Sequence, residues 1–141
     1  MKSMGKFLVF ITVCLMLGGC GQKAAPRVNL VTAVEVTWTR DGQTNQAIYT
    51  QPGKVRRFLY YLRRQKTAGY AQVKPERIEG NMCCIRVYLT DGTVRVWRQR
   101  AERFVSVDYH RWKNLETPWG KRIYFLLRLI PPDPVANPGT C

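Results

Sequence analysis

Two stretches of the chain alternate apolar and polar residues, and an Asp-Gly pair interrupts each of them. The first stretch covers residues 30–50 around Asp41-Gly42, and the second covers residues 83–98 around Asp91-Gly92. A period of two predicts strands with one buried face, and an Asp-Gly pair between such strands predicts a β-hairpin with a two-residue turn. We therefore expect two β-hairpins.

Counting outward from the first turn predicts how that hairpin pairs. Val36 then lies opposite Ala47, and Val34 lies opposite Tyr49. Side chains two positions apart on a strand share a face. These four residues, together with Trp38, therefore form the predicted buried face of the first hairpin.

The same count in the second hairpin predicts an apolar inner face, with Leu89 opposite Val94 and Val87 opposite Val96. The outer face then carries two cation–aromatic pairs, Tyr88 with Arg95 and Arg86 with Trp97. Such pairs stabilise a sheet by about 0.2–1 kcal/mol each. They would also form a basic, aromatic platform for an anionic polymer, a peptide or a glycan, and the sequence leaves both interpretations open.

Residues 54–66 have the period of an amphipathic helix. The apolar stripe consists of Val55, Phe58, Leu59 and Leu62. The opposite side carries Arg56, Tyr60, Arg63 and Arg64. This cationic side is either a solvated helix surface or a docking surface on which the arginines contact phosphate groups.

A second helix is predicted to start at Thr117-Pro118, with the threonine hydroxyl as the cap and proline at the first helical position. Its stripe of Trp119, Ile123, Leu126, Leu127 and Ile130 is apolar enough to cover a sheet. Between the helices, residues 67–80 are expected to form a loop. Residues 103–108 are expected to form a third strand, in the same meander as the second hairpin. Residues 109–116 are expected to form a connection.

The predicted fold is therefore α+β, in the order β-β-α-β-β-β-α. An antiparallel sheet of about five strands carries two helices on one face. The sequence predicts a single domain over residues 30–130 and a flexible, proline-rich tail over residues 131–141.

The N-terminal segment has the features of an export signal. Lys2 and Lys6 flank an apolar run over residues 7–17, which is too short to cross a bilayer, since a span takes about 20 residues. The sequence Leu17-Gly18-Gly19-Cys20 that ends this run resembles the lipobox of bacterial lipoproteins. The resemblance implies removal of residues 1–19, lipidation of Cys20 and retention on the extracytoplasmic side of the cell membrane. Residues 20–29 are then a polar tether.

The chain is strongly basic, with 23 Lys and Arg against 9 Asp and Glu. Loss of Lys2 and Lys6 with the signal leaves 21 basic and 9 acidic residues, a net charge of +12. Such a charge attracts polyanions. For a protein held beside a membrane, the expected partners are anionic lipid, a cell-wall polymer or an acidic protein, and nucleic acid is not expected.

Three cysteines remain when Cys14 leaves with the signal and Cys20 is lipidated. Strand alternation points Cys83 inward and Cys84 outward, which makes Cys84 the better partner for a disulfide with Cys141. Free, packed thiols are the alternative. Without a C-x-x-C motif, and with His110 as the single histidine, we expect neither a metal site nor a cofactor.

No motif for nucleophilic or metal catalysis occurs in the sequence. Ser106, Asp108 and His110 lie close together, but the end of a strand explains them equally well. The region from the Asp91-Gly92 hairpin to Pro118-Trp119 is similar to small Gram-positive lipoproteins without an assigned activity, so this similarity implies no reaction.

The sequence thus predicts a membrane-anchored, non-enzymatic binding or accessory module. Its predicted binding face consists of Arg86, Tyr88, Arg95 and Trp97. The alternative is an electrostatic docking domain that uses the arginines of the first helix on anionic lipid or a cell-wall polymer.

Overall fold

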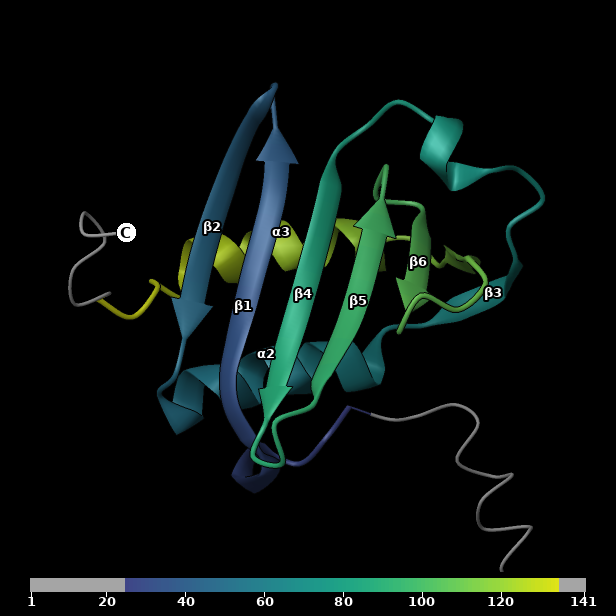
Figure 1. Cartoon of the computed structure of the whole chain (residues 1–141). Helices are drawn as coiled ribbons and strands as arrows, with labels where there is room; N and C mark the ends of the chain where they lie inside the picture. The colour runs from purple at the N-terminus through teal and green to yellow at the C-terminus, as the bar shows by residue number, and fades with distance from the viewer. Residues whose placement is uncertain (1–24, 135–141) are drawn as a thin grey trace, which may run out of the picture.

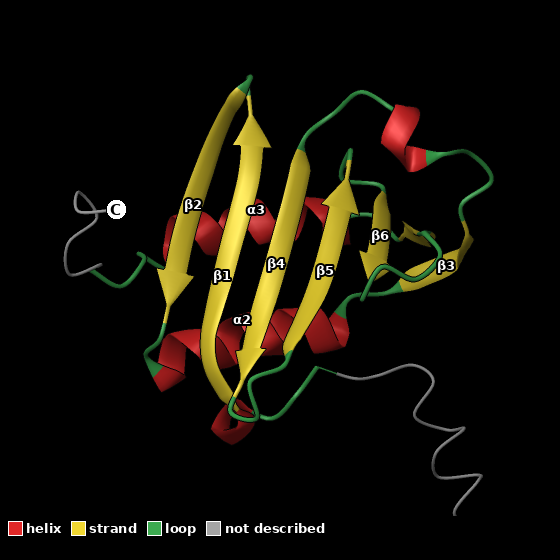
Figure 2. Ribbon diagram, in the orientation of Figure 1, coloured by secondary structure: helices red, strands yellow, loops and turns green. Residues whose placement is uncertain are grey.

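Seven strands form one antiparallel sheet in the computed structural model, which describes residues 25–134. The strand order is β2-β1-β4-β5-β6-β7-β3, and both helices lie behind one face of the sheet (Figures 1 and 2). The strands are β1 Val31–Arg40, β2 Gln43–Tyr49, β3 Thr67–Tyr70, β4 Met82–Leu89, β5 Val94–Arg100, β6 Phe104–Val107 and β7 Lys113–Leu115. The helices are α2 Pro52–Arg64 and α3 Trp119–Leu129, with 3-10 turns η1 Val28–Leu30 and η2 Pro75–Arg77. The α+β class and the placement of the helices are confirmed.

The β1–β2 hairpin has the predicted register. Asp41 and Gly42 both have positive φ, 52° and 76°, as a two-residue type I′ turn requires. The predicted pairs of Val34 with Tyr49 and of Val36 with Ala47 are present, and all four residues are buried. Trp38 is half-buried against the same core.

The β4–β5 hairpin differs from the prediction by one residue. The N–H of Leu89 donates to the carbonyl oxygen of Thr93 at 2.9 Å, so the loop has three residues instead of two. In this loop Gly92 takes the positive φ, 87°, at the position where a three-residue hairpin requires it. The register then pairs Tyr88 with Val94 and Ile85 with Trp97. The predicted pairs Tyr88–Arg95, Arg86–Trp97, Leu89–Val94 and Val87–Val96 are therefore wrong.

The side chain of Asp91 explains this loop. Its carboxylate accepts hydrogen bonds from the N–H of Thr93 at 2.9 Å and from the Thr93 hydroxyl at 2.6 Å, and both bonds lower its pKa. An aspartate that binds the backbone two residues on stabilises a local Asx turn. Because a slip of one residue turns each side chain to the other face, Arg95 and Trp97 lie on the helix-covered face of the sheet.

Two short strands were not predicted. β3 lies within the expected loop over residues 67–80, and β7 lies within the expected connection over residues 109–116. They pair with each other, Thr67 with Leu115 and Tyr70 with Lys113, and they extend the sheet beyond β6. Neither segment alternates apolar and polar residues. These strands have only four and three residues, and they form because their backbones pair with a neighbouring strand.

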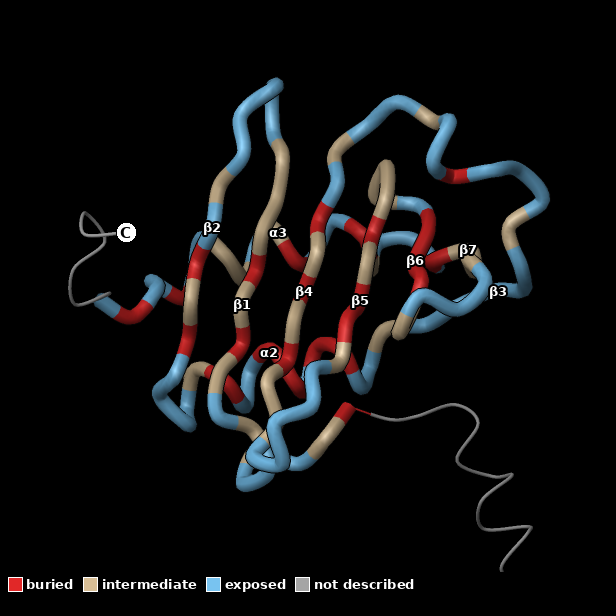
Figure 3. The backbone as a smooth tube through the Cα atoms, viewed as in Figure 1, coloured by how far each residue is buried: buried red, intermediate tan, exposed pale blue. Residues whose placement is uncertain are grey.

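The core lies between the sheet and the helices, as the buried segments in Figure 3 show. The predicted stripe of α2 is buried: Val55, Phe58, Leu59 and Leu62. Tyr61 is buried as well. The stripe of α3 also faces the core, with Ile123 and Ile130 fully buried and Trp119, Leu126 and Leu127 partly buried. Pro118, not Thr117, occupies the N-cap position of α3, and no side chain caps this helix.

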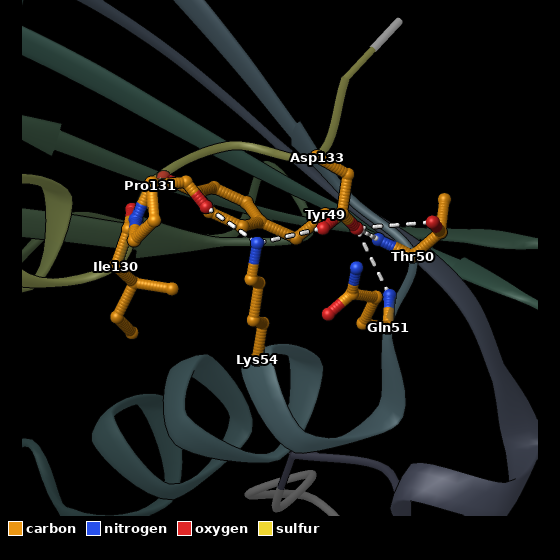
Figure 4. A network of polar contacts seen from close by, with 7 residues as sticks. All are labelled: Tyr49, Thr50, Gln51, Lys54, Ile130, Pro131 and Asp133. Atoms are coloured by element: carbon orange, nitrogen blue, oxygen red, sulfur yellow. Dashed lines mark hydrogen bonds and ion pairs between the residues drawn. The ribbon is translucent and has the colours of Figure 1, made fainter.

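Both ends of the described chain pack against the domain. Ala25 is only 6% exposed within the core cluster, so the packed domain begins before residue 30, inside the predicted tether over residues 20–29. Asp133 is 9% exposed and is held by the start of α2 (Figure 4), so residues 131–134 are not the flexible tail that the sequence predicted. The lipobox with Cys20 and the C-terminal Cys141 lie outside the described residues. No helix within residues 25–134 is long and apolar enough to span a bilayer.

Candidate functional site: a basic pocket at the uncovered end of the sheet

A cavity of about 590 Å³ lies beside the last turn of α2. The helix ends just before β3, while strands β6, β7 and β3 extend the sheet past it (Figure 1). The helix-side face of these short strands is therefore only partly covered. The cavity is bounded by α2, by the strands β3, β5, β6 and β7, and by the chain at Ala25.

The floor of this pocket is apolar. It is lined by Leu62, Trp97, Val105 and Val107. Trp97 pairs with Val107 across β5 and β6 and is only 2% exposed. The register of the β4–β5 hairpin places Trp97 here, because it turns this residue to the same face as the buried Ile85.

The rim of the pocket is cationic and aromatic. Its cations are Arg63, Arg95, Arg111 and Lys113. The guanidinium of Arg111 lies 4.3 Å from the centre of the Tyr70 ring, and the Lys113 ammonium lies 5.8 Å from it. Arg95 stacks on the Trp97 ring at 4.6 Å. The pocket thus combines positive charge with aromatic surfaces.

Asp108 is the one acid among the described residues that line the pocket. Its carboxylate accepts a hydrogen bond from Arg95 Nε at 3.1 Å and another from the N–H of Val96 at 2.9 Å. Within residues 25–134, no ion pair involves Arg63, Arg111 or Lys113. The positive charge of these three residues is therefore not balanced by the described part of the pocket.

This arrangement suits an anionic ligand. Guanidinium and ammonium groups form charge-assisted hydrogen bonds to carboxylate, phosphate or sulfate oxygens. Ligand pockets commonly join an apolar lining to a few polar groups that fix the ligand's orientation. Here the apolar floor would contact a ring or a short chain, while the rim would hold the anionic group.

The predicted outer binding face is divided between the two sides of the sheet. Arg86 and Tyr88 remain on the open face, where both contact the carboxylate of Glu35, at 3.4 Å and 3.3 Å. Arg95 and Trp97 line the pocket on the other side. The four residues therefore do not form one platform, and the acid beside Arg86 and Tyr88 offsets part of their attraction for anions.

Arg98 organises the open face of the sheet, a role that the sequence did not indicate. Its guanidinium lies 4.6 Å from the Tyr109 ring and 4.8 Å from the Trp112 ring, and it donates to the Ser106 hydroxyl at 3.1 Å. Trp112 Nε1 donates to Glu76 at 2.7 Å. These contacts tie the segments around η2 and β7 to the open face of β5 and β6.

Ser106, Asp108 and His110 do not form a catalytic relay. The Ser106 hydroxyl donates to the backbone oxygen of His110 at 2.6 Å, and Nδ1 of His110 lies 2.9 Å from the backbone oxygen of Val107. Asp108 binds Arg95 instead of the histidine. A nucleophile–base pair requires a side-chain contact between serine and histidine, and these contacts go to the backbone.

The exposed side of α2 is cationic, as predicted. Arg56, Tyr60, Arg63 and Arg64 are all exposed, and so is Arg57. Arg64 lies 5.1 Å from the Tyr60 ring. Only Arg63 also belongs to the pocket. The rest of this surface is therefore a separate feature from the pocket.

Cys83 and Cys84 are free thiols. Cys83 is buried, as its predicted inward orientation requires, and burial raises its thiol pKa. Cys84 is half-buried, and burial raises its pKa despite the neighbouring Arg86 and Arg98. The predicted partner, Cys141, lies outside the described residues. Within residues 25–134, no three His, Cys, Asp or Glu side chains are grouped to hold a metal ion.

A second, smaller cavity of about 290 Å³ lies against α3. It is lined by Arg40, Lys121 and Arg128, but also by Glu102. Its basic residues are exposed and lie at the end of β1 and on α3, and none of them lines the basic pocket. These residues therefore provide matched controls for charge changes in the pocket and on α2.

The chain matches no protein-family model, and comparisons with curated proteins and with solved structures find no match.

Proposed function

We propose that this protein is a lipid-anchored, extracytoplasmic binding module whose basic pocket binds a small anionic ligand with a ring or a short apolar chain. The observation that carries this proposal is the set of Arg63, Arg111 and Lys113 around an apolar floor, without an ion pair to any described residue. The anchor is the diacylglycerol that the lipobox resemblance implies at Cys20.

The charge of the rim supports an anion as the ligand. The positive charges around the rim repel one another. A bound anion would attract each of them and so offset this repulsion. Arg111 and Lys113 both lie over the Tyr70 ring, with their charged groups 4.3 Å and 5.8 Å from its centre. An anionic group beside this ring would be attracted by both cations.

The floor supports an apolar part in the same ligand. Leu62, Val105 and Trp97 line the pocket with apolar atoms but are already nearly inaccessible to water, so a ring above them would chiefly bury its own apolar surface. Such burial contributes about 25 cal/mol per Å². A ligand with both parts should therefore bind better than either part alone.

Calorimetry with three probes tests this proposal. Phenyl phosphate carries both parts, inorganic phosphate carries the anion alone, and benzyl alcohol carries the ring alone. We expect phenyl phosphate to bind more tightly than either of the others. The Arg111→Gln/Lys113→Gln variant should lose about tenfold or more in phenyl phosphate affinity, because two charge-assisted contacts are removed.

The control variant is Arg40→Gln/Lys121→Gln, which removes the same charge at the smaller cavity. It should bind phenyl phosphate within about twofold of the parent protein, because neither residue lines the basic pocket and salt screens exposed charges. Equal losses in the two variants, or equal affinity for phenyl phosphate and inorganic phosphate, would contradict a built pocket. The mass of the mature protein tests the anchor separately, since acylation at Cys20 adds the mass of its acyl chains.

A further inference from the structure

We infer that the exposed face of α2 docks on the anionic bilayer to which the chain is anchored, with Arg56, Arg57, Tyr60 and Arg64 against the lipid headgroups. This inference rests on the lipid anchor at Cys20, which is part of the proposed function, and not on the pocket. The partner is the lipid surface itself.

The charge of α2 is the first observation. Its exposed face carries four arginines, and the sequence contains no acidic residue between Asp41 and Glu76. Lys54, at the start of the helix, is turned to Asp133. Within residues 25–134, no ion pair involves the arginines of this face. The face therefore has the charge that an anionic leaflet attracts.

The aromatic residue on this face suits a headgroup region. Tyr60 is 56% exposed at the centre of the arginines, and Arg64 stacks on its ring at 5.1 Å. Tyrosine is enriched where a protein meets the interfacial layer of a bilayer, since its ring is apolar and its hydroxyl is polar. Arginine contributes the phosphate contacts.

The start of the described chain is the second observation. Ala25 is buried beside the end of α2, where it lines the pocket together with Leu62 and Arg63. The following turn, η1, contacts the same helix. The chain that leads to the anchor therefore leaves the domain next to α2 and not next to α3.

The length of that chain limits where the membrane can lie. Four residues lie between Cys20 and Ala25, so the chain takes five steps of at most about 3.6 Å each, or about 18 Å in all. At 1.5 Å per residue, the 13 residues of α2 have a length of about 20 Å. An acylated Cys20 would therefore keep the bilayer within about 18 Å of Ala25, a reach shorter than α2 itself.

Vesicle binding by the chain that begins at Gly21 tests the docking without the acyl chains. Residues 25–134 contain the whole core described above, so this chain retains the fold. The probes are vesicles of phosphatidylcholine alone and vesicles that also contain phosphatidylglycerol. We expect binding only to the second kind, with a steep loss between about 0.01 M and about 1 M salt, as the Debye length falls from about 30 Å to about 3 Å.

Two triple variants locate the surface. Arg56→Gln/Arg57→Gln/Arg64→Gln neutralises the face but keeps Arg63, which lines the pocket. It should lower partitioning into phosphatidylglycerol vesicles by about tenfold or more, since each arginine near such a surface contributes about fivefold. The matched control Arg40→Gln/Lys121→Gln/Arg128→Gln removes the same charge from exposed positions elsewhere and should lower partitioning by about threefold or less.

Several outcomes would overturn the inference. These are equal losses in the two triple variants, salt-insensitive binding, and tighter binding of soluble polyphosphate than of vesicles at the same phosphate concentration. The α2 variant should still bind phenyl phosphate with the parent affinity, so failure of the docking does not affect the pocket. A mature protein without acyl mass would remove the anchor and leave the pocket proposal standing.

Discussion

The carboxylate of Asp133 accepts a hydrogen bond from the backbone N–H of Gln51 at 3.0 Å, although 82 positions separate the two residues. The same carboxylate also accepts from the N–H and the hydroxyl of Thr50 and pairs with Lys54 at 2.9 Å (Figure 4). Gln51 is the N-cap residue of α2, and its own side chain makes no capping bond. A residue from beyond α3 therefore supplies the negative charge that favours the start of α2.

The first prediction concerns this contact. Asp133→Asn keeps the size of the side chain but removes the charge that several donors share, so it should lower the free energy of unfolding by about 2–3 kcal/mol at neutral pH. Urea unfolding measures this change. Asp41→Asn, at the exposed turn of the first hairpin, is the matched control and should have little effect. Equal stability of the two variants would show that Asp133 does not hold the start of α2.

The same contact predicts a dependence on pH. Hydrogen bonds from the backbone of Thr50 and from Lys54 hold the pKa of Asp133 well below its usual value of about 3.9. A carboxyl with a lowered pKa in the folded state stabilises the protein above its unfolded pKa, and this contribution is lost as the pH falls towards the folded value. The stability difference between the parent protein and Asp133→Asn should therefore be constant near pH 7 and shrink below about pH 4.

A second prediction concerns the approach of α3 to the turn before β6. A Cβ atom on Gly120 would lie 2.0 Å from the carbonyl oxygen of Glu102, which belongs to the backbone and cannot rotate away. Gly120→Ala should therefore lower the free energy of unfolding by about 3 kcal/mol or more. Gly53→Ala, in the first turn of α2, meets no atom within 4 Å and should leave stability unchanged or raise it by up to about 1 kcal/mol. Thermal unfolding of both variants measures the contrast, and similar melting temperatures would contradict the close approach.

A third prediction concerns the buried hydroxyl of Tyr61. This group donates to the carbonyl oxygen of Trp119 at 2.6 Å and accepts from Nε2 of Gln99 at 2.9 Å, and burial raises its pKa. Tyr61→Phe leaves both partners buried without this contact, which should cost about 1–3 kcal/mol. The neighbouring Tyr60→Phe removes an exposed hydroxyl and should change stability by less than about 0.5 kcal/mol. Denaturant unfolding that ranks the two variants equally would count against the Tyr61 contacts.

A double-mutant cycle extends this third prediction. The Oε1 atom of Gln99 is buried without a hydrogen-bond partner among the described residues. Gln99→Leu removes that orphaned acceptor, so Tyr61→Phe should cost less in the Gln99→Leu background than in the parent protein. Additive effects of the two changes would show that the tyrosine and the glutamine do not interact.

The first hairpin and α2 could be predicted because their signals are local. Asp41-Gly42 specifies a turn through its own backbone, and the register of Val36 with Ala47 follows by counting from that turn. The period that buries Phe58 and exposes Arg56 is likewise contained in one helix. Contacts within a few residues of each other decide these features, so the residue pattern was sufficient.

In the second hairpin, a loop one residue longer than predicted changes which side chains lie on the predicted binding face. The signal that could have shown the three-residue loop was Thr93, which gives the carboxylate of Asp91 a second donor. Without this donor, the sequence places Arg95 and Trp97 on the wrong face of the sheet. The slip of one residue moved them from the open surface into the pocket.

The sequence by itself determined the fold class, the first hairpin, the two amphipathic helices and the cationic side of α2, since each depends on periodicity or on one turn. Only the tertiary structure decided the pairing of β3 with β7, the contacts between Asp133 and the start of α2, and the set of residues that line the pocket. These depend on segments as distant as Leu62 and Lys113, which approach each other only when the sheet is complete. Such contacts form when the whole chain buries its apolar surface, so the residue pattern of a single segment does not predict them.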